Sequence, residues 1–156
     1  MIRGLLQGAL AGAAGTTALN ATTYGDMAVR ARSSSSTPEQ AVDDLAEAVG
    51  HPVPGEGEER ENRLSGLGAL TGIAVGVGTG AVLGVLRHAG LRPPLWLGGA
   101  VAGVLAMAVT DLPMARLGMV SDPRSWSRQG WLSDIVPHLA YGYVTCATLQ
   151  GLERGR

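Results

Sequence analysis

The chain has neither lysine nor phenylalanine, and its 156 residues include a single cysteine, Cys146. One cysteine excludes an intramolecular disulfide and a cysteine-rich metal site. The net charge of −1 leaves no excess of positive charge for a nucleic acid, so we expect no nucleic-acid partner. All the basic residues are arginine and glycine is abundant, with 24 copies. This composition indicates a bacterial genome rich in G and C.

Glycine recurs at every fourth position within an apolar run that extends from Leu64 to Leu86. On a helix this spacing places five glycines on one face, namely Gly68, Gly72, Gly76, Gly80 and Gly84. In water each would cost a helix about 1 kcal/mol relative to alanine. In lipid the backbone must satisfy its own hydrogen bonds, and small residues four apart let a second helix approach closely. The run therefore predicts a membrane helix with a glycine-lined packing face.

Three other segments are apolar and rich in glycine or alanine, so we predict an all-α integral membrane protein, a bundle of four transmembrane helices in one domain. The domain covers residues 1–156, with spans at 2–26, 64–88, 94–112 and 129–152 and a soluble loop at 30–63. A cleaved signal peptide is the alternative for the first segment, because Arg3 precedes an apolar stretch.

The polar loop is predicted to contain a short amphipathic helix. Thr37 is the expected N-cap, Pro38 the first helical position and Gln40 the capping-box position. Gly50 ends the helix. Because its polar face is acidic, we expect its apolar face to pack on the bundle rather than on anionic lipid. Residues 52–62 are then predicted to form a solvated acidic loop.

Polar side chains recur along the last segment at intervals of three and four residues, which places them on one helix face. They are Asp134, His138, Tyr141, Thr145 and Thr148. The polar face of a membrane helix must meet protein or water rather than lipid. Polar groups of the first and third segments can meet this face in the interior. The candidate polar binding cluster is therefore Asn20, Asp111, Asp134, His138 and Tyr141.

Two interpretations of this cluster stay open. In the first, interhelical hydrogen bonds fix the register of a glycine-rich bundle. In the second, Asp134 and His138 belong to a proton or ion path, because histidine exchanges protons near neutral pH. The first interpretation makes the cluster structural and the second makes it functional.

Metal-binding and enzymatic interpretations have less support. Asp134 and His138 have the spacing of two metal ligands, but further ligands would have to come from a few distant residues, namely Asp26, Asp111, His51 or His88. Ser133 lacks the motif of an activated nucleophile. We therefore predict no metal, no cofactor and no catalytic residues.

The last segment contains the motif Trp131…Asp134…Pro137-His138-Leu-Ala-Tyr141-Gly142. Together with the helix start Thr37-Pro38-Glu39, and with Arg63 before a glycine-rich second span, it resembles a family of small bacterial inner-membrane proteins of unknown function, typified by the YagU acid-resistance protein. The resemblance covers the four-span layout and the last helix. It implies a multi-pass inner-membrane protein, related to stress, whose biochemical activity is unknown.

From these features we expect a small non-enzymatic integral protein of the bacterial inner membrane, structural, accessory or stress-related in function. The alternative is a proton or ion channel or transporter that uses a polar interior path around Asp134 and His138. The expected partners are the lipid bilayer and, through the glycine-lined faces, a second copy or a larger membrane complex.

Overall fold

A computed structural model describes the chain except for residues 117, 119–121 and 155–156. The regular structure of the described residues is entirely helical, which confirms the all-α prediction for this part of the chain. The elements are α1 (Ile2–Arg30), α2 (Thr37–Ala48), α3 (Gly57–His88), α4 (Leu95–Arg116), the 3₁₀ turn η1 (Pro123–Ser125) and α5 (Arg128–Arg154).

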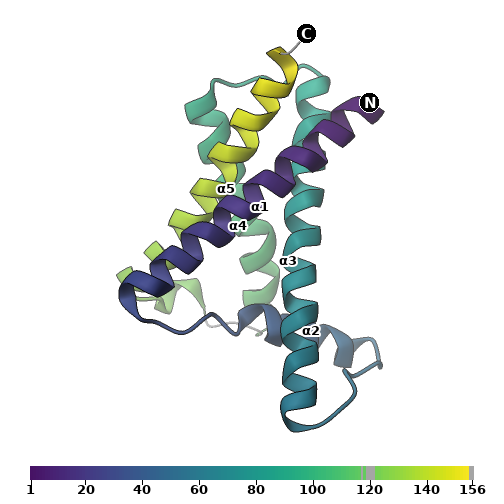
Figure 1. Cartoon of the computed structure of the whole chain (residues 1–156), viewed down its shortest axis with the longest axis vertical. Helices are drawn as coiled ribbons and strands as arrows, with labels where there is room; N and C mark the ends of the chain where they lie inside the picture. The colour runs from purple at the N-terminus through teal and green to yellow at the C-terminus, as the bar shows by residue number, and fades with distance from the viewer. Residues whose placement is uncertain (117, 119–121, 155–156) are drawn as a thin grey trace.

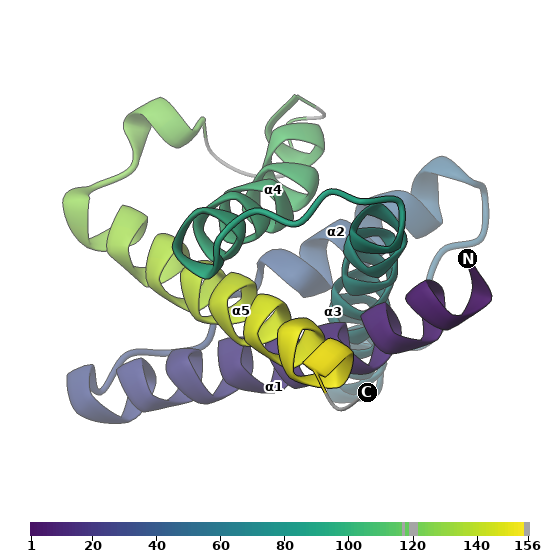
Figure 2. The same ribbon diagram turned by 90° about the horizontal axis from the view of Figure 1, so that it is seen from above.

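The four long helices lie side by side in the spatial order α3, α1, α5, α4 (Figures 1 and 2). Helices α3 and α4 barely touch, although only the short turn at 89–94 joins them. The start of α1, this turn and the end of α5 lie at one end of the bundle, at the top of Figure 1. We call it the terminal end. The opposite end, where α2 packs beside the start of α3, is the loop end.

Among the described helices, only α3 and α4 are long and apolar enough to cross a membrane. Four such helices were predicted, and the segments 2–26 and 129–152 do not meet this criterion. Length is not the cause, because α1 has 29 residues and extends for about 43 Å. The cause is composition: α1 and α5 are rich in glycine, alanine and threonine and contain polar residues such as Asn20, Asp134 and His138, which supply little apolar surface.

Helices α1 and α3 meet backbone to backbone along paired glycines. A β-carbon on Gly12 would lie 2.5 Å from the Gly76 carbonyl oxygen, and a β-carbon on Gly80 would lie 2.5 Å from that of Gly8. A β-carbon on Gly84 would lie 2.6 Å from the Gly8 Cα. These separations are too short for any side chain, so glycine alone fits and a close helix contact results.

The other two glycines of the predicted packing face do not contact α1. A β-carbon on Gly68 would meet Pro38 of α2 at 3.1 Å, whereas one on Gly72 would meet nothing within 4 Å. Four of the five predicted packing glycines therefore lie against another helix, whereas Gly72 lies against none. The reason is the inclination of α1, which crosses α3 at an angle and diverges from it towards the loop end (Figure 1).

A second glycine contact joins α4 to α5. A β-carbon on Gly103 would lie 2.6 Å from the His138 carbonyl oxygen, and one on Gly142 would lie 2.9 Å from the Gly103 Cα. Between α1 and α5, a β-carbon on Gly15 would lie 2.9 Å from the Tyr141 ring. Each of the three main helix contacts is thus lined by glycine.

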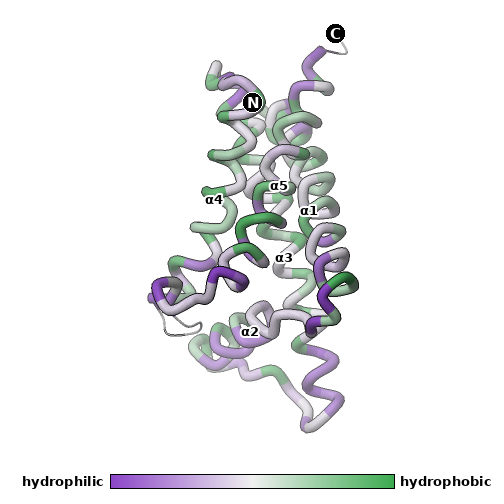
Figure 3. The backbone as a smooth tube through the Cα atoms, turned by 90° about the vertical axis from the view of Figure 1, so that its left-hand side faces the viewer, coloured by the Kyte–Doolittle hydropathy of each residue, from purple (hydrophilic) through white to green (hydrophobic). Residues whose placement is uncertain are grey.

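Small residues fill most of the interior, with Tyr141 and Leu149 as the largest fully buried side chains, and many large apolar residues lie on the outside. The buried residues of α4 are all glycine or alanine, while Leu10, Val82, Trp96 and Val104 are among many large apolar residues that are exposed. Only 11% of the most apolar window of α3 is buried. Hydrophilic residues gather mostly near the ends, above all around α2 and the start of α3 (Figure 3). A bundle that folds in water has the opposite distribution.

Helix α2 packs on α3, as predicted, but begins differently. Ser36 rather than Thr37 is its N-cap residue, without a side-chain cap. The Gln40 amide donates to the Ser36 hydroxyl oxygen at 2.9 Å rather than closing a capping box on the backbone. Gly50 follows the helix with φ of +74°, a conformation that glycine adopts readily.

The predicted acidic loop at 52–62 is helical in its second half, because α3 begins at Gly57. Glu58 and Glu59 lie in the first turn of α3, where negative charge stabilises the positive end of the helix dipole. Glu59 also pairs with Arg63 one turn later, at 2.5 Å. Helix α4 likewise continues to Arg116, four residues past the predicted end.

Candidate functional site: an acid–histidine cluster between α4 and α5

Helices α4 and α5 bring Asp111, Asp134 and His138 together, and we call these three residues the acid–histidine cluster. The Nδ1 atom of His138 lies 3.1 Å from Oδ1 of Asp134 and 2.8 Å from the Asp134 carbonyl oxygen. The four-residue spacing on α5 produces this contact. The two side chains are largely shielded from solvent, with exposed fractions of 16% for His138 and 24% for Asp134.

Asp111 joins the cluster from α4. Its carboxyl group is close enough to the Asp134 carboxyl group for the two to interact electrostatically, and its Oδ1 accepts a hydrogen bond from the Thr110 hydroxyl at 3.3 Å. Within the described part of the chain, the Oδ2 atoms of Asp111 and Asp134 are buried without a hydrogen-bond partner. Because ionised carboxylates only accept hydrogen bonds, each of these two oxygens lacks a donor group.

Tyr141 lies on the same face of α5 but contacts a different helix. The residue is only 1% exposed, and its hydroxyl donates to the Gly76 carbonyl oxygen of α3 at 2.7 Å. It reaches α3 across the space left by Gly15 of α1. Asn20 is half-buried on α1, and no hydrogen bond among the described residues joins it to the acid–histidine cluster. The five candidate residues therefore do not form one site.

The described residues contain no group of three histidine, cysteine, aspartate or glutamate side chains that could hold a metal ion. Asp26 pairs with arginines instead, and His51 and His88 are exposed. The Ser133 hydroxyl donates to the Gln129 carbonyl oxygen at 2.8 Å. Its proton is therefore directed to a backbone acceptor rather than to a catalytic base.

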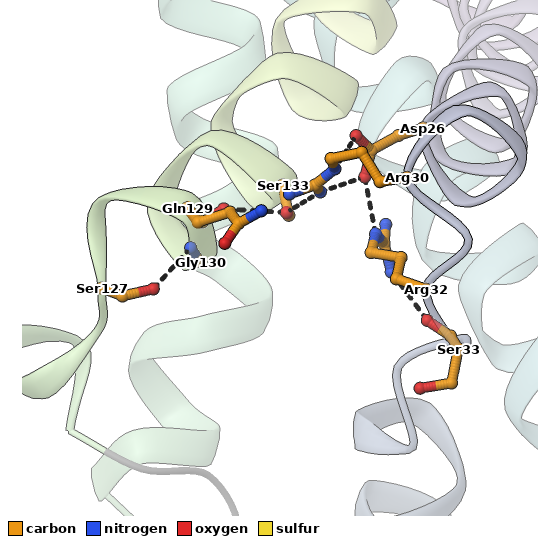
Figure 4. Close-up of polar contacts among 8 residues, drawn as sticks. All are labelled: Asp26, Arg30, Arg32, Ser33, Ser127, Gln129, Gly130 and Ser133. Atoms are coloured by element: carbon orange, nitrogen blue, oxygen red, sulfur yellow. Dashed lines mark hydrogen bonds and ion pairs between the residues drawn. The ribbon is translucent and has the colours of Figure 1, made fainter.

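A second polar cluster, which the sequence patterns missed, links α1 to α5 at the loop end (Figure 4). Arg30 binds the carboxylate of Asp26 and also donates to the Ser133 hydroxyl. Arg32 contacts the same carboxylate at 2.6 Å. Asp26 lies beyond the apolar part of α1, which ends near Ala21. Hydrogen bonds from Arg30 and then Arg32 lower the pKa of Asp26 to about 2, because both cations favour its charged form.

At the terminal end, Arg87 of α3 and Glu153 of α5 form an ion pair that the sequence patterns also missed. The Nη2 atom of Arg87 lies 2.8 Å from Oε2 of Glu153, and the Arg87 side chain is 9% exposed. The sequence contains only a weak signal for this pair. If the four helices alternate in direction, residues 87 and 153 reach the same end of the bundle, but nothing local specifies that they meet.

Comparison with models of known protein families gives no match, and comparisons with curated proteins and with solved structures give none either. The resemblance to the YagU-like family therefore stays a prediction that depends on the motif of α5.

Proposed function

We propose that this protein is a small non-enzymatic integral protein of the bacterial inner membrane, with a structural, accessory or stress-related role. The observation that carries the proposal is the inverted burial pattern. Glycine, alanine and threonine lie inside, whereas Leu10, Val82 and Val104 are each about as exposed as a surface residue, at 64%, 60% and 59%. Such a surface is stable in hydrocarbon and unstable in water.

The same argument extends the membrane domain to all four long helices. Helices α1 and α5 lie between α3 and α4, and glycines join them to these neighbours at backbone distance. If α3 and α4 cross the bilayer, α1 and α5 cross with them. Several of their polar groups are turned inward, as at Thr16, Tyr141 and Thr145, and in this orientation they avoid the lipid.

Cysteine accessibility tests this arrangement. In a Cys146→Ala background, single cysteines replace Val82 of α3, Leu10 of α1 and Ala147 of α5, all exposed and at similar depth from the terminal end. We expect a membrane-impermeant maleimide to label none of them in sealed or opened vesicles. Asp44→Cys on α2 is the reactive control. Labelling of Leu10→Cys and Ala147→Cys, with Val82→Cys protected, would leave two spans and overturn the four-span bundle.

A second candidate function, a proton or ion channel or transporter, is favoured by the acid–histidine cluster. Two carboxyl groups and an imidazole lie side by side, and this combination transfers protons in other membrane contexts. Two surface hollows, of about 570 and 620 Å³, are lined by other residues. The cluster thus has proton-binding chemistry and lines neither hollow.

Proton flux into liposomes separates the two candidates. A channel or transporter predicts flux for the wild type that is lost in His138→Gln and Asp134→Asn. A structural role predicts no flux in the wild type, and that result would eliminate the transport hypothesis. The matched control is Thr148→Val, which removes a polar group from the same helix face but lies outside the acid–histidine cluster.

A further inference from the structure

The terminal end of the bundle contains a hollow of about 620 Å³. It lies between the end of α3, the turn at 89–94, the start of α4 and the end of α5. The residues that matter for its chemistry are Arg87, Arg92, Leu95, Gln150, Glu153 and Arg154. Three arginines against one glutamate give this hollow a net positive charge.

The three arginines differ in how their charge is compensated. Arg87 is buried and held by both carboxylate oxygens of Glu153, at 2.8 and 3.3 Å. Arg92 and Arg154 are exposed, and among the described residues neither has a hydrogen-bond or ion-pair partner. Two guanidinium groups are therefore free to bind an anion. Guanidinium groups bind phosphate oxygens in a two-pronged geometry, more specifically than a lysine ammonium does.

The start of α4 adds to this positive potential. Leu95 is the first residue of α4 and lines the hollow. The first N–H groups of a helix have no partner within the helix, and they carry a partial positive charge. Because Pro93 and Pro94 directly precede α4, the helix begins abruptly at the edge of the hollow. The N–H groups of Leu97 and Gly98 donate to the Pro94 carbonyl oxygen, so the contribution of the helix start to the hollow is its positive potential.

The surroundings of the hollow indicate where that anion comes from. The hollow lies where α3 ends and α4 begins, and these are the two helices that are apolar enough to cross a membrane. Leu91 in the turn and Trp96 on α4 are 60% and 67% exposed beside it. Tryptophan is enriched at the membrane interface, at the level of the lipid headgroups. Apolar side chains do not stabilise a free phosphate ion, whereas they can contact the acyl chains of a phospholipid.

We propose that this hollow binds the phosphate group of an anionic phospholipid, with Arg92 and Arg154 as its ligands and Arg87 as their fixed neighbour. The proposal rests on the membrane location proposed above. It assigns the terminal end to the membrane leaflet that presents anionic headgroups. It also gives the bundle a lipid ligand at the turn where α3 and α4 are otherwise nearly unconnected.

Native mass spectrometry of the full chain in a neutral detergent tests the proposal. The probes are phosphatidylglycerol and phosphatidylcholine with identical acyl chains. We expect phosphatidylglycerol to bind roughly tenfold more tightly, because arginines near an anionic headgroup each add to the attraction. The double variant Arg92→Gln/Arg154→Gln should lose this preference. The double variant Arg124→Gln/Arg128→Gln has the same net charge, changes two exposed arginines outside the hollow, and should keep the preference.

Three results would overturn the proposal. The wild type shows no preference for phosphatidylglycerol, or both double variants lose the preference equally, or inorganic phosphate at millimolar concentration displaces the lipid completely. The last result would identify free phosphate as the ligand. Carbonate extraction of vesicles that contain the protein is a separate readout. Release by carbonate would contradict the membrane location, whereas retention without a lipid preference would contradict the lipid site alone.

Discussion

The Tyr141 hydroxyl of α5 lies 2.7 Å from the Gly76 carbonyl oxygen of α3 and donates a hydrogen bond to it. Apart from this bond and the Arg87–Glu153 ion pair at the terminal end, α3 and α5 barely touch, because α1 lies between them. The bond passes α1 where Gly15 leaves room for the tyrosine ring. One buried side chain thus connects three helices, and this favours a structural role for Tyr141.

Removal of the Tyr141 hydroxyl should destabilise the bundle measurably. For Tyr141→Phe we expect a loss of about 0.5–1.5 kcal/mol in the free energy of unfolding, since the ring stays and one hydrogen bond is lost. Thermal unfolding in detergent measures the change. Tyr143→Phe is the control, because this residue is 39% exposed and its hydroxyl lies 3.3 Å from the Trp96 carbonyl oxygen. Equal effects of the two substitutions would contradict the structural role.

Two glycines of α3 should respond in opposite ways to alanine. Gly80→Ala places a methyl group against the Gly8 backbone and should destabilise the bundle by about 1–3 kcal/mol, the usual cost of overpacking. Gly72→Ala meets open space and should leave stability unchanged or raise it by up to about 1 kcal/mol, through helix propensity. Thermal unfolding of both variants tests this, and a loss of stability in Gly72→Ala would contradict the observed divergence of α1 from α3.

The Asp26–arginine contacts should make stability depend on pH below pH 4. Binding to Arg30 and Arg32 lowers the pKa of Asp26 from 3.8 to about 2. A depressed folded-state pKa contributes stability above the unfolded value, and this contribution is lost as pH falls towards 2. We therefore expect wild type to exceed Asp26→Asn in melting temperature at pH 6, and by less at pH 2.5. Asp44→Asn, an exposed site, should show neither difference. A gap of equal size at both pH values would refute the prediction.

The acid–histidine cluster should tolerate an amide at position 111. Asp111→Asn introduces an N–H donor next to Asp134, whose buried Oδ2 has no donor among the described residues. We expect stability at pH 7.5 to rise by about 1 kcal/mol, the usual value of one hydrogen bond. Thermal unfolding checks this. Asp111→Leu is the control, because it removes the negative charge without adding a donor. It separates the loss of repulsion between the two carboxyl groups from the gain of a hydrogen bond to Asp134. Destabilisation by Asp111→Asn would show that Asp111 is needed as an acceptor.

Local spacing predicted much of the helical structure correctly. The four-residue glycine repeat predicted a close helix contact, and the contact exists at Gly76, Gly80 and Gly84. The repeat does not determine the crossing angle between α1 and α3, because this angle depends on how the whole surfaces of the two helices pack. For this reason Gly72 is part of the four-residue glycine repeat but does not contact another helix.

The candidate site shows the same division. The spacing of Asp134 and His138 predicted a contact within α5, and the contact exists. Asp111 lies near Asp134 because α4 packs on α5. No local sequence pattern specifies the spatial order α3, α1, α5, α4. The ion pair of Arg87 with Glu153 and the bond from Arg30 to Ser133 depend on the same order. These contacts between distant residues required the structure.

The weak contact between α3 and α4 also has a consequence for biosynthesis. As the chain leaves the ribosome, α1 and α3 can pair as soon as both have been synthesised. The close contacts of Gly99 and Gly103, in contrast, are with α5, which is synthesised later. Until α5 emerges, a nascent chain presents the glycine face of α4 without its partner. Synthesis of α5 therefore completes the contacts of α4, and a chain that stalls before α5 leaves Gly99 and Gly103 uncovered.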